Sequence, residues 1–279
     1  MTATVSVIIP THNRRHTLAT ALDSVASQTL PAHEVIVVDD GSSDDTAAWL
    51  CATRPDVQVI EQANCGVSAA RNRGIAAARG DWIALLDSDD AWVSEKLDRQ
   101  LSALQSAPAL RLCHTDEIWL RNGVRVNPKR RHAKSGGHIF RQCLPLCAIS
   151  PSAALIHRSV FTDIGGFDES LPACEDYDLW LRLCSQEPVL YIDEMLVIKT
   201  GGHDDQLSRR YPAMDQYRIH ALLKLLESTP LTHADRVATL EVLDQKLTIF
   251  GDGARKRDRT AVLDALLARR SALDKANPL

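Results

Sequence analysis

Apolar and polar positions alternate along residues 1–90 in the manner of strands separated by helices. Four short runs rich in Val, Ile and Leu predict buried strands, at residues 5–9, 34–40, 57–60 and 82–86. Between them, Leu18, Leu22 and Val25 recur at helical spacing, and the alanine-rich stretch 66–80 ends in glycine, as helices commonly do. This alternation predicts a parallel sheet with helices on both faces.

Polar clusters follow three of these predicted strands directly. They are PTHN at 10–13, DDGSSDD at 39–45 and DSDD at 87–90. Parallel strands end at the same edge of a sheet, and open α/β sheets bind ligands at that edge. The three clusters are therefore expected to surround one ligand site.

The second half of the chain has a less regular pattern. Strands are predicted at RLCH, at SAALIH, at VLYI and at MLVIKT, and EIWLRNGVRV reads as a hairpin around Asn122 and Gly123. Helices are predicted at residues 97–104 and 175–184, and from residue 212 onward apolar residues recur mainly at helical spacing. We therefore expect a helical C-terminal extension.

Composition narrows the function classes. The chain has 279 residues, 45% of them hydrophobic, and a net charge of −4, which provides no basic field for nucleic acid. No apolar run reaches the length of a membrane span, and no secretory signal precedes the first strand, so a cytoplasmic location is expected. The seven cysteines are scattered and form no CxxC pair, which favours reduced thiols over a zinc site.

The DSDD cluster places Asp87, Asp89 and Asp90 within four positions at the end of an apolar run. Like charges this close repel one another, and partial desolvation raises the cost. A hard divalent cation would offset the repulsion, since magnesium binds one or two carboxylates together with substrate phosphates. From the residues alone, an exposed acidic turn or a helix cap also explains the cluster.

Two further acidic pairs have both a functional and a structural interpretation. Asp40, at the end of the second predicted strand, is placed to accept hydrogen bonds from a ribose or a base, or it is a turn residue before Gly41. Glu175 and Asp176 open a predicted helix, where one acts as a general base or both simply favour the helix dipole.

Basic residues also leave two interpretations open. Arg71 pairs with a phosphate or an acidic cluster, or lies on the surface. His203, in a glycine-rich loop, contacts a metal or phosphate, or neither. The segment 121–134 carries six Lys or Arg and no acid, so it grips an anionic acceptor, touches a membrane surface, or is a solvated loop.

Taken in order, these motifs resemble the family 2 glycosyltransferases of the GT-A fold. The resemblance rests on VSVIIPTHNR, SQTLPAHEVIVVDDGSSDDT, NCGVSAARNRGIAAARGDWIALLDSDD, GGFDE and EDYDLWLRL, and covers about the first 200 residues. It implies an α/β fold of Rossmann-like GT-A type, with a mixed, mainly parallel sheet flanked by helices. The implied division is a GT-A domain at 1–205, with a nucleotide-binding half (1–90) and an acceptor-binding half (91–205), followed by the helical extension 206–279.

The resemblance also implies a role for each candidate residue. A nucleotide-sugar would be bound by Pro10, Thr11, His12, Asn13, Asp40, Arg71, Asp87 and Ser88. A divalent metal, manganese or magnesium, would be held by Asp89 with Asp87 and His203. Asp176 matches the catalytic base, with Glu175 beside it in the catalytic pair.

The implied reaction transfers one sugar, with inversion, from a nucleotide-sugar, by preference a UDP-sugar, to a hydroxyl of a carbohydrate or glycolipid acceptor. The setting would be polysaccharide or glycolipid biosynthesis. A peripheral contact with the inner face of a membrane and a homodimer remain open. The sequence leaves three alternatives: a haloacid dehalogenase-like phosphohydrolase, a phosphoacceptor receiver domain, and a non-catalytic nucleotide-sugar-binding module.

Overall fold

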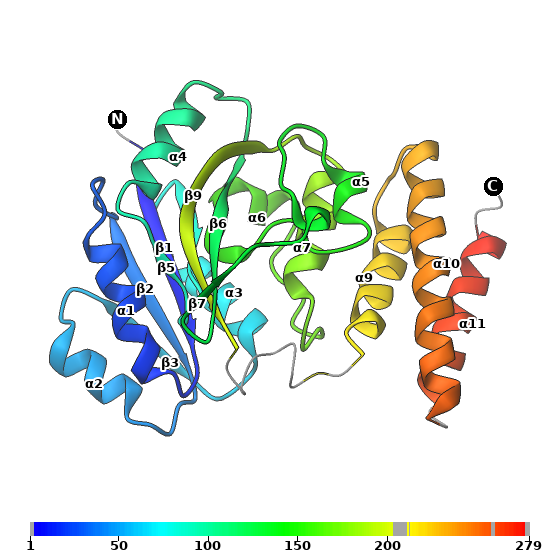
Figure 1. Cartoon of the computed structure of the whole chain (residues 1–279), viewed down its shortest axis with the longest axis horizontal. Coiled ribbons are helices and arrows are strands. Elements are labelled where there is room, and N and C mark those ends of the chain that lie inside the picture. Colours follow the sequence, from blue (N-terminus) through cyan, green and yellow to red (C-terminus); the bar gives the residue numbers. More distant parts are fainter. Residues whose placement is uncertain (1–2, 203–210, 212, 258–259, 277–279) are drawn as a thin grey trace.

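The computed structural model describes residues 3–202, 211, 213–257 and 260–276 (Figure 1). Its strands are β1 (Val5–Thr11), β2 (Glu34–Asp40), β3 (Gln58–Gln62), β4 (Trp82–Leu85), β5 (Ala91–Trp92), β6 (Leu112–Arg121), β7 (Val124–Val126), β8 (Leu155–His157) and β9 (Leu190–Gly201). Its α-helices are α1 (Arg15–Ala26), α2 (Thr46–Thr53), α3 (Val67–Ala77), α4 (Lys96–Gln105), α5 (Phe140–Cys143), α6 (Ser159–Asp163), α7 (Glu175–Cys184), α9 (Asp215–Ser228), α10 (His233–Lys256) and α11 (Thr260–Ala276). Two short 3₁₀ helices, η1 (Arg130–His132) and η2 (Pro151–Ala153), complete the described elements.

One mixed sheet carries the fold, with strand order β3-β2-β1-β4-β8-β6-β9-β5 and β7 paired to β6. The first four strands in this order are parallel, as the strand–helix alternation predicts. Strand β8 runs antiparallel to both β4 and β6, while β6 and β9 are parallel to each other. The sheet is therefore regular in its N-terminal half and mixed beyond β4.

Alternate residues of β1 point to opposite faces of the sheet and enter different hydrophobic clusters. Ile8 joins the cluster that includes Ala70 of α3, whereas Val7 and Ile9 join the cluster that includes Leu18 of α1. The period of two along a strand thus explains why this apolar run needs helices on both faces.

The predicted strands differ from the structure mainly in β1, β6 and β9. Strand β1 continues through Pro10, because its pairing with β4 ends at Ile8 and the missing N–H is not needed on that side. The predicted RLCH and EIWLR strands form the single strand β6, and the two short strands at 189–200 form the single strand β9. A bulge in β9 opposite Asp116, which includes Asp193 and Glu194, lets the β6–β9 ladder continue.

The C-terminal helices α9, α10 and α11 share one hydrophobic cluster with α7. Leu222 of α9, Leu243 of α10 and Leu266 of α11 are buried in the cluster that also contains Trp180 of α7. The helical extension predicted from the sequence is therefore packed onto the sheet domain. The predicted boundary at residue 205 lies outside the described residues. Over the described ranges, no helix combines the length and apolarity that a bilayer crossing requires.

Candidate functional site

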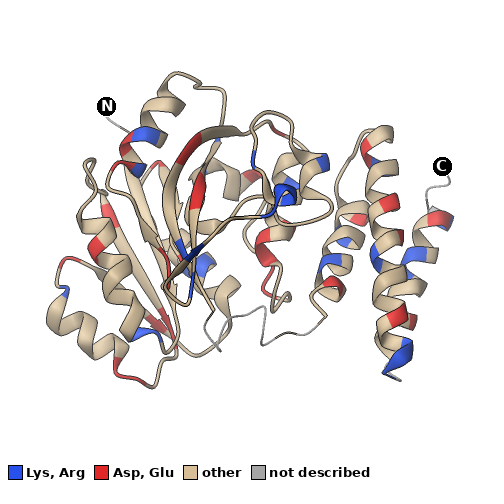
Figure 2. Ribbon diagram, in the orientation of Figure 1, with Lys and Arg blue, Asp and Glu red and all other residues tan. Residues whose placement is uncertain are grey.

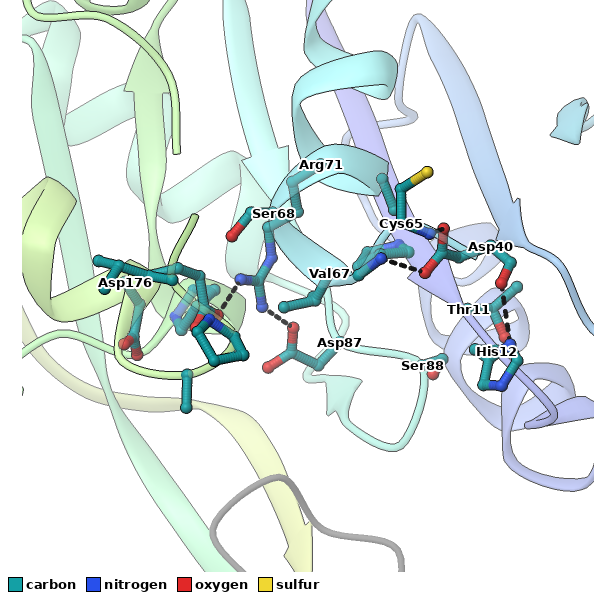
Figure 3. Close-up of a pocket in the computed structure, with 18 of the residues that line it drawn as sticks. Thr11, His12, Asp40, Cys65, Val67, Ser68, Arg71, Asp87, Ser88 and Asp176 are labelled. Atoms are coloured by element: carbon teal, nitrogen blue, oxygen red, sulfur yellow. Dashed lines mark hydrogen bonds and ion pairs between the residues drawn. The ribbon is translucent and has the colours of Figure 1, made fainter. Parts of the chain in front are cut away.

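A cavity of about 890 Å³ opens where β1, β2 and β4 end, at the start of α3 and beside α7 (Figure 3). The predicted residues that line it are Pro10, Thr11, His12, Asn13, Asp40, Arg71, Asp87, Ser88, Asp89, Glu175 and Asp176. Only His203, among the residues singled out from the sequence, lies outside the described part of the chain. The fold therefore gathers residues that are up to 166 positions apart, from Pro10 to Asp176, around one cavity.

Asp40 organises the turn that enters α3. Its carboxylate accepts hydrogen bonds from the backbone N–H groups of Cys65 and Gly66, each at 2.8 Å, and from Gln62 Nε2 at 2.8 Å. Its backbone oxygen lies 2.9 Å from Nδ1 of His12 (Figure 3). Gly66 has φ of +91°, a conformation that favours glycine at this position. Asp40 thus fixes the cavity wall between β1 and α3.

Arg71 is a buried bridge between the two sides of the cavity. Its guanidinium donates to Asp87 Oδ1 at 2.7 Å (Figure 3) and to Glu175 Oε1 at 2.6 Å. It also lies over the ring of Phe167. Burial alone would lower the pKa of Arg71, but the two carboxylates outweigh it and raise the pKa. Burial raises the pKa of Glu175 despite the neighbouring guanidinium. Arg71 therefore holds α7 against the end of β4.

The three carboxylates of the DSDD cluster have different partners. Asp87 uses one oxygen for Arg71, and Asp89 uses one oxygen for Arg14. Asp90 is buried, and its two oxygens accept from the hydroxyl of Ser152 and the backbone N–H of Thr200. Burial raises the pKa of Asp90 to about 8. The repulsion inferred from the sequence is thus relieved by protein partners, and Asp90 is a structural member of the cluster.

Asp176 lies half-buried at the start of α7 and faces the same cavity. One carboxylate oxygen accepts from its neighbour's N–H, that of Tyr177, at 2.7 Å. The other oxygen lies 3.2 Å from Sγ of Cys147, whose thiol pKa is raised well above its usual range by burial and by this carboxylate. In the described part of the chain, Asp176 makes no ion pair, in contrast to Glu175.

Three residues that line the site or touch it were not singled out from the sequence. Arg14 follows the PTHN cluster and pairs with Asp89, so its place at a strand end was a usable signal. Lys199 ends the apolar run of β9, and four carboxylates, among them Asp87 and Asp176, raise its pKa against the opposing effect of burial. Cys147 had no sequence signal, because only the packing of the loop after α5 brings it to Asp176.

Two buried hydroxyls line the cavity without a hydrogen-bond partner among the described residues. They are Oγ1 of Thr11, at the end of β1, and Oγ of Ser68, on α3. An unpaired buried hydroxyl is costly unless a ligand or water satisfies it. The cavity therefore offers polar atoms to a ligand. All seven cysteines are free thiols, as the sequence predicts, and the described residues hold no group of three His, Cys, Asp or Glu that could bind a metal.

Comparison with protein families and relatives fits this geometry. The model of glycosyl transferase family 2 matches residues 6–165, and a second model, glycosyltransferase-like family 2, matches residues 139–197. The chain is 32% identical over 207 residues to an uncharacterized glycosyltransferase of Rickettsia typhi, which covers 72% of this chain and 65% of that protein. A Rickettsia conorii relative is 30% identical over 200 residues, and the match spans only 32% of its length.

A third relative carries a specific name. It is the UDP-Glc:alpha-D-GlcNAc-diphosphoundecaprenol beta-1,3-glucosyltransferase WfgD of Escherichia coli, 30% identical over 195 residues, with 68% of this chain and 73% of that protein covered.

Solved structures share the fold. TarS 1–349 of S. aureus in complex with UDP-GlcNAc superposes with a TM-score of 0.68 at 21% identity, over 88% of this chain and 71% of that one. The mannosyltransferase PcManGT of Pyrobaculum calidifontis, in complex with GDP-Man and Mn2+, superposes with a TM-score of 0.64 at 18% identity. The match covers 100% of this chain and 82% of that one. The fold is therefore the GT-A glycosyltransferase fold, as expected from the sequence. On its family match and its relatives, this chain belongs to glycosyl transferase family 2.

Proposed function

We propose that this glycosyltransferase moves one sugar, with inversion and with the help of a divalent metal, from a nucleotide-sugar to an acceptor hydroxyl. The observation that carries the proposal is that Asp87 and Asp89 face the same cavity as Asp176. The carboxylates proposed for the leaving diphosphate and the proposed base therefore line one cavity. Family membership favours this reaction over the phosphohydrolase and receiver-domain alternatives, and the DSDD cluster follows the fourth strand along the chain, not the first.

The donor side of the cavity supports binding of a nucleoside diphosphate. Thr11 and Ser68 offer hydroxyls, and the Asp40 turn forms a wall on which a base can rest. Arg14 and Lys199 add positive charge beside the DSDD cluster, where a diphosphate would lie. TarS is named in complex with UDP and WfgD is named for UDP-Glc, so we propose a UDP-sugar as the donor.

The residues present fit a divalent cation held by two carboxylates. One oxygen of Asp87 and one of Asp89 contact arginine, so the second oxygen of each is available to a hard cation. Two protein carboxylates with substrate phosphates are the usual magnesium arrangement, and this agrees with the lack of a larger ligand cluster among the described residues. Once bound, manganese or magnesium would neutralise charge on the leaving diphosphate. We propose His203 as a further ligand beside these two carboxylates.

Asp176 is the proposed general base. Its half-buried carboxylate faces the cavity and makes no ion pair among the described residues, so it can accept a proton. The acceptor oxygen would give its proton to Asp176 and form a bond to the anomeric carbon while the bond to the diphosphate breaks. Attack from the side opposite the leaving group inverts the anomeric centre.

Glu175 has a different proposed role from that of Asp176. Its carboxylate is buried and paired with Arg71, which also holds Asp87. A carboxylate neutralised in this way is poorly suited to take a proton from an acceptor, but it fixes the distance between base and donor sides. We therefore propose Glu175 as a positioning residue within the catalytic pair.

We also propose a division of the chain and an acceptor class. Residues 1–90 would form the nucleotide-binding half, 91–205 the acceptor-binding half and 206–279 the helical extension. The acceptor would be a carbohydrate or glycolipid, and WfgD, which is named for a diphosphoundecaprenol-linked sugar, supports the glycolipid. A homodimer is the proposed assembly.

The test is calorimetric titration of UDP, GDP and dTDP, each with manganese and with EDTA. We expect one nucleotide, UDP by preference, to bind tightly with manganese and weakly with EDTA. A parallel assay follows release of UDP from UDP-glucose and UDP-GlcNAc by the wild type and by Asp176→Asn. Failure of all three nucleotides to bind would contradict the proposal and favour a non-catalytic relative.

A further inference from the structure

Five exposed basic side chains form a surface that we call the basic edge: Arg121, Arg125, Lys129, Arg130 and Arg131. Figure 2 shows Lys and Arg along β7 and on η1, the elements that carry most of them. None of the five makes an ion pair with a described carboxylate. Arginines of the C-terminal helices differ, since Arg269 pairs with Glu227 and Arg270 pairs with Asp244. The basic edge therefore keeps its positive charge for an external partner.

The β6–β7 end of the basic edge lies next to residues that line the cavity. Arg121 pairs in register with Gly201, the residue that follows the cavity-lining Thr200. On the same ladder, Trp119 lies opposite Lys199, which also lines the cavity. The strand pair β6–β9 thus connects the β6–β7 hairpin to the side of the cavity that is proposed to bind the acceptor.

Two other basic-segment residues anchor the loop that follows β7. Lys134 pairs with the buried carboxylate of Glu117 at 2.9 Å, and the ring of His132 lies 5.4 Å from that of Trp119. These contacts hold η1 against the sheet, so that Arg130 and Arg131 are displayed on a fixed element. The segment 121–134 is therefore anchored to the sheet by its strands at one end and by His132 and Lys134 at the other.

Exposed apolar side chains accompany these charges. Val124, at the hairpin between Arg121 and Arg125, is 66% exposed, and Met195, 45% exposed, lies 3.4 Å from a guanidinium nitrogen of Arg125. Cations beside exposed apolar residues are typical of surfaces that rest in the headgroup region of a bilayer. A soluble phosphate would require neither the apolar residues nor cations on two separate segments.

We propose that the basic edge docks on an anionic lipid surface, with the cavity mouth held next to the lipid headgroups. The charges would contact lipid phosphates, and Val124 would enter the interface. This docking goes beyond the proposed function, and only its benefit to a glycolipid acceptor rests on that function. The resemblance to WfgD, named for an acceptor on a lipid diphosphate, agrees with this placement.

The test is cosedimentation of the full chain with vesicles of phosphatidylglycerol and phosphatidylcholine in equal parts, and with phosphatidylcholine alone. The variant Lys129→Gln/Arg130→Gln/Arg131→Gln removes three charges from the basic edge. The matched variant Lys256→Gln/Arg257→Gln/Lys275→Gln removes three exposed charges from the C-terminal helices. We expect the wild type to bind anionic vesicles only. The first variant should lose about 100-fold in vesicle affinity, and the second variant should lose none.

Two results would overturn the proposal: equal binding of anionic vesicles by both variants, or wild-type binding to vesicles made of phosphatidylcholine alone. Inorganic pyrophosphate provides a further arm: if it binds the wild type but not the first variant, and vesicles bind neither, the basic edge holds soluble phosphate and the lipid proposal is wrong. UDP titration with manganese tests the proposed function separately from the docking, because the basic edge does not contact the donor side of the cavity. Retained UDP binding without vesicle binding would refute only the docking.

Discussion

The two halves of the sheet differ in strand direction and in where they place polar residues. Strands β1 to β4 are parallel and bury apolar residues on both faces, and their polar residues stand at the strand ends, as Asp40 and Asp87 do. Strands β5 to β9 are mixed and bury ionisable groups along their length, including His114 and Glu117 of β6. The first half gathers its polar residues at the sheet edge where we propose that the donor binds, and is the proposed donor platform. The second half also depends on buried charge pairs such as that of Glu117 with Lys134.

The largest expected effect separates the proposed tasks of the two halves. Asp176→Asn should lower kcat by about 1,000-fold, because a positioned general base contributes roughly 100- to 10,000-fold. UDP affinity with manganese should be unchanged, since the donor side is intact. Steady-state kinetics and calorimetry check both values. Asp98→Asn, an exposed position on α4, is the control.

Two results would break this separation. Full turnover by Asp176→Asn would refute its role as the base. Loss of UDP affinity in the same variant would mean that the second half also binds the donor.

The second expectation concerns the buried charges of β6. Glu117 pairs with Lys134, with side-chain exposures of 1% and 6%, so Glu117→Gln should destabilise the fold by about 3 kcal/mol through the unpaired lysine. Burial would raise the pKa of Glu117, but Lys199 and Lys134 outweigh it and lower the pKa from 4.5 to about 2. A depressed acid pKa stabilises the fold above pH 4.5, and this contribution is lost as the pH falls toward 2.

Urea unfolding at pH 7 and at pH 3 measures this difference. We expect the gap between wild type and Glu117→Gln to shrink at the lower pH. Glu61→Gln, an exposed position on β3, should show no gap at either pH. A gap that stays constant between the two pH values would show that the charge of Glu117 is not what stabilises β6.

The same contrast explains which parts of the molecule could be predicted from sequence. In the first half, each strand is an apolar run that ends in polar residues, so its position and its contribution to the ligand edge follow from local pattern. The cavity position of Thr11, Asp40 and Asp87 was predictable for that reason. Glu175 and Asp176 were candidates from the residues, but the choice of Asp176 as the base came from the family resemblance, because an acid at a helix start is ambiguous by itself.

In the second half, tertiary contacts determine which residues reach the cavity, and the local sequence pattern does not show them. The bulge opposite Asp116 joins β9 into one strand, and the ladder then places Lys199 beside the carboxylates of the cavity. Cys147 reaches Asp176 from 29 positions away through loop packing. The pairing of Arg71 with both Asp87 and Glu175 also joins segments that no periodicity relates.

A third expectation tests the donor platform. Asp89→Asn should weaken UDP binding in manganese by at least tenfold, because ligand changes at metal sites commonly have effects of this size or larger. UDP binding in EDTA should change little. If affinity falls equally in manganese and in EDTA, Asp89 acts through its pair with Arg14 and is not a metal ligand.

The smallest expected effect concerns the contact between Cys147 and Asp176. A thiol that donates to Asp176 holds that carboxylate in one orientation, and the raised pKa of Cys147 keeps the thiol protonated. Cys147→Ala removes this donor, so kcat should fall by about threefold, the size expected from a modest hydrogen bond. Cys147→Ser should restore the wild-type kcat, and Cys51→Ala, at an exposed thiol, should leave it unchanged. The same thiol also lies 3.2 Å from the backbone oxygen of Ile149. An unchanged kcat in Cys147→Ala would therefore mean that the proton is donated to Ile149, and that loop packing supports the second half without orienting its base.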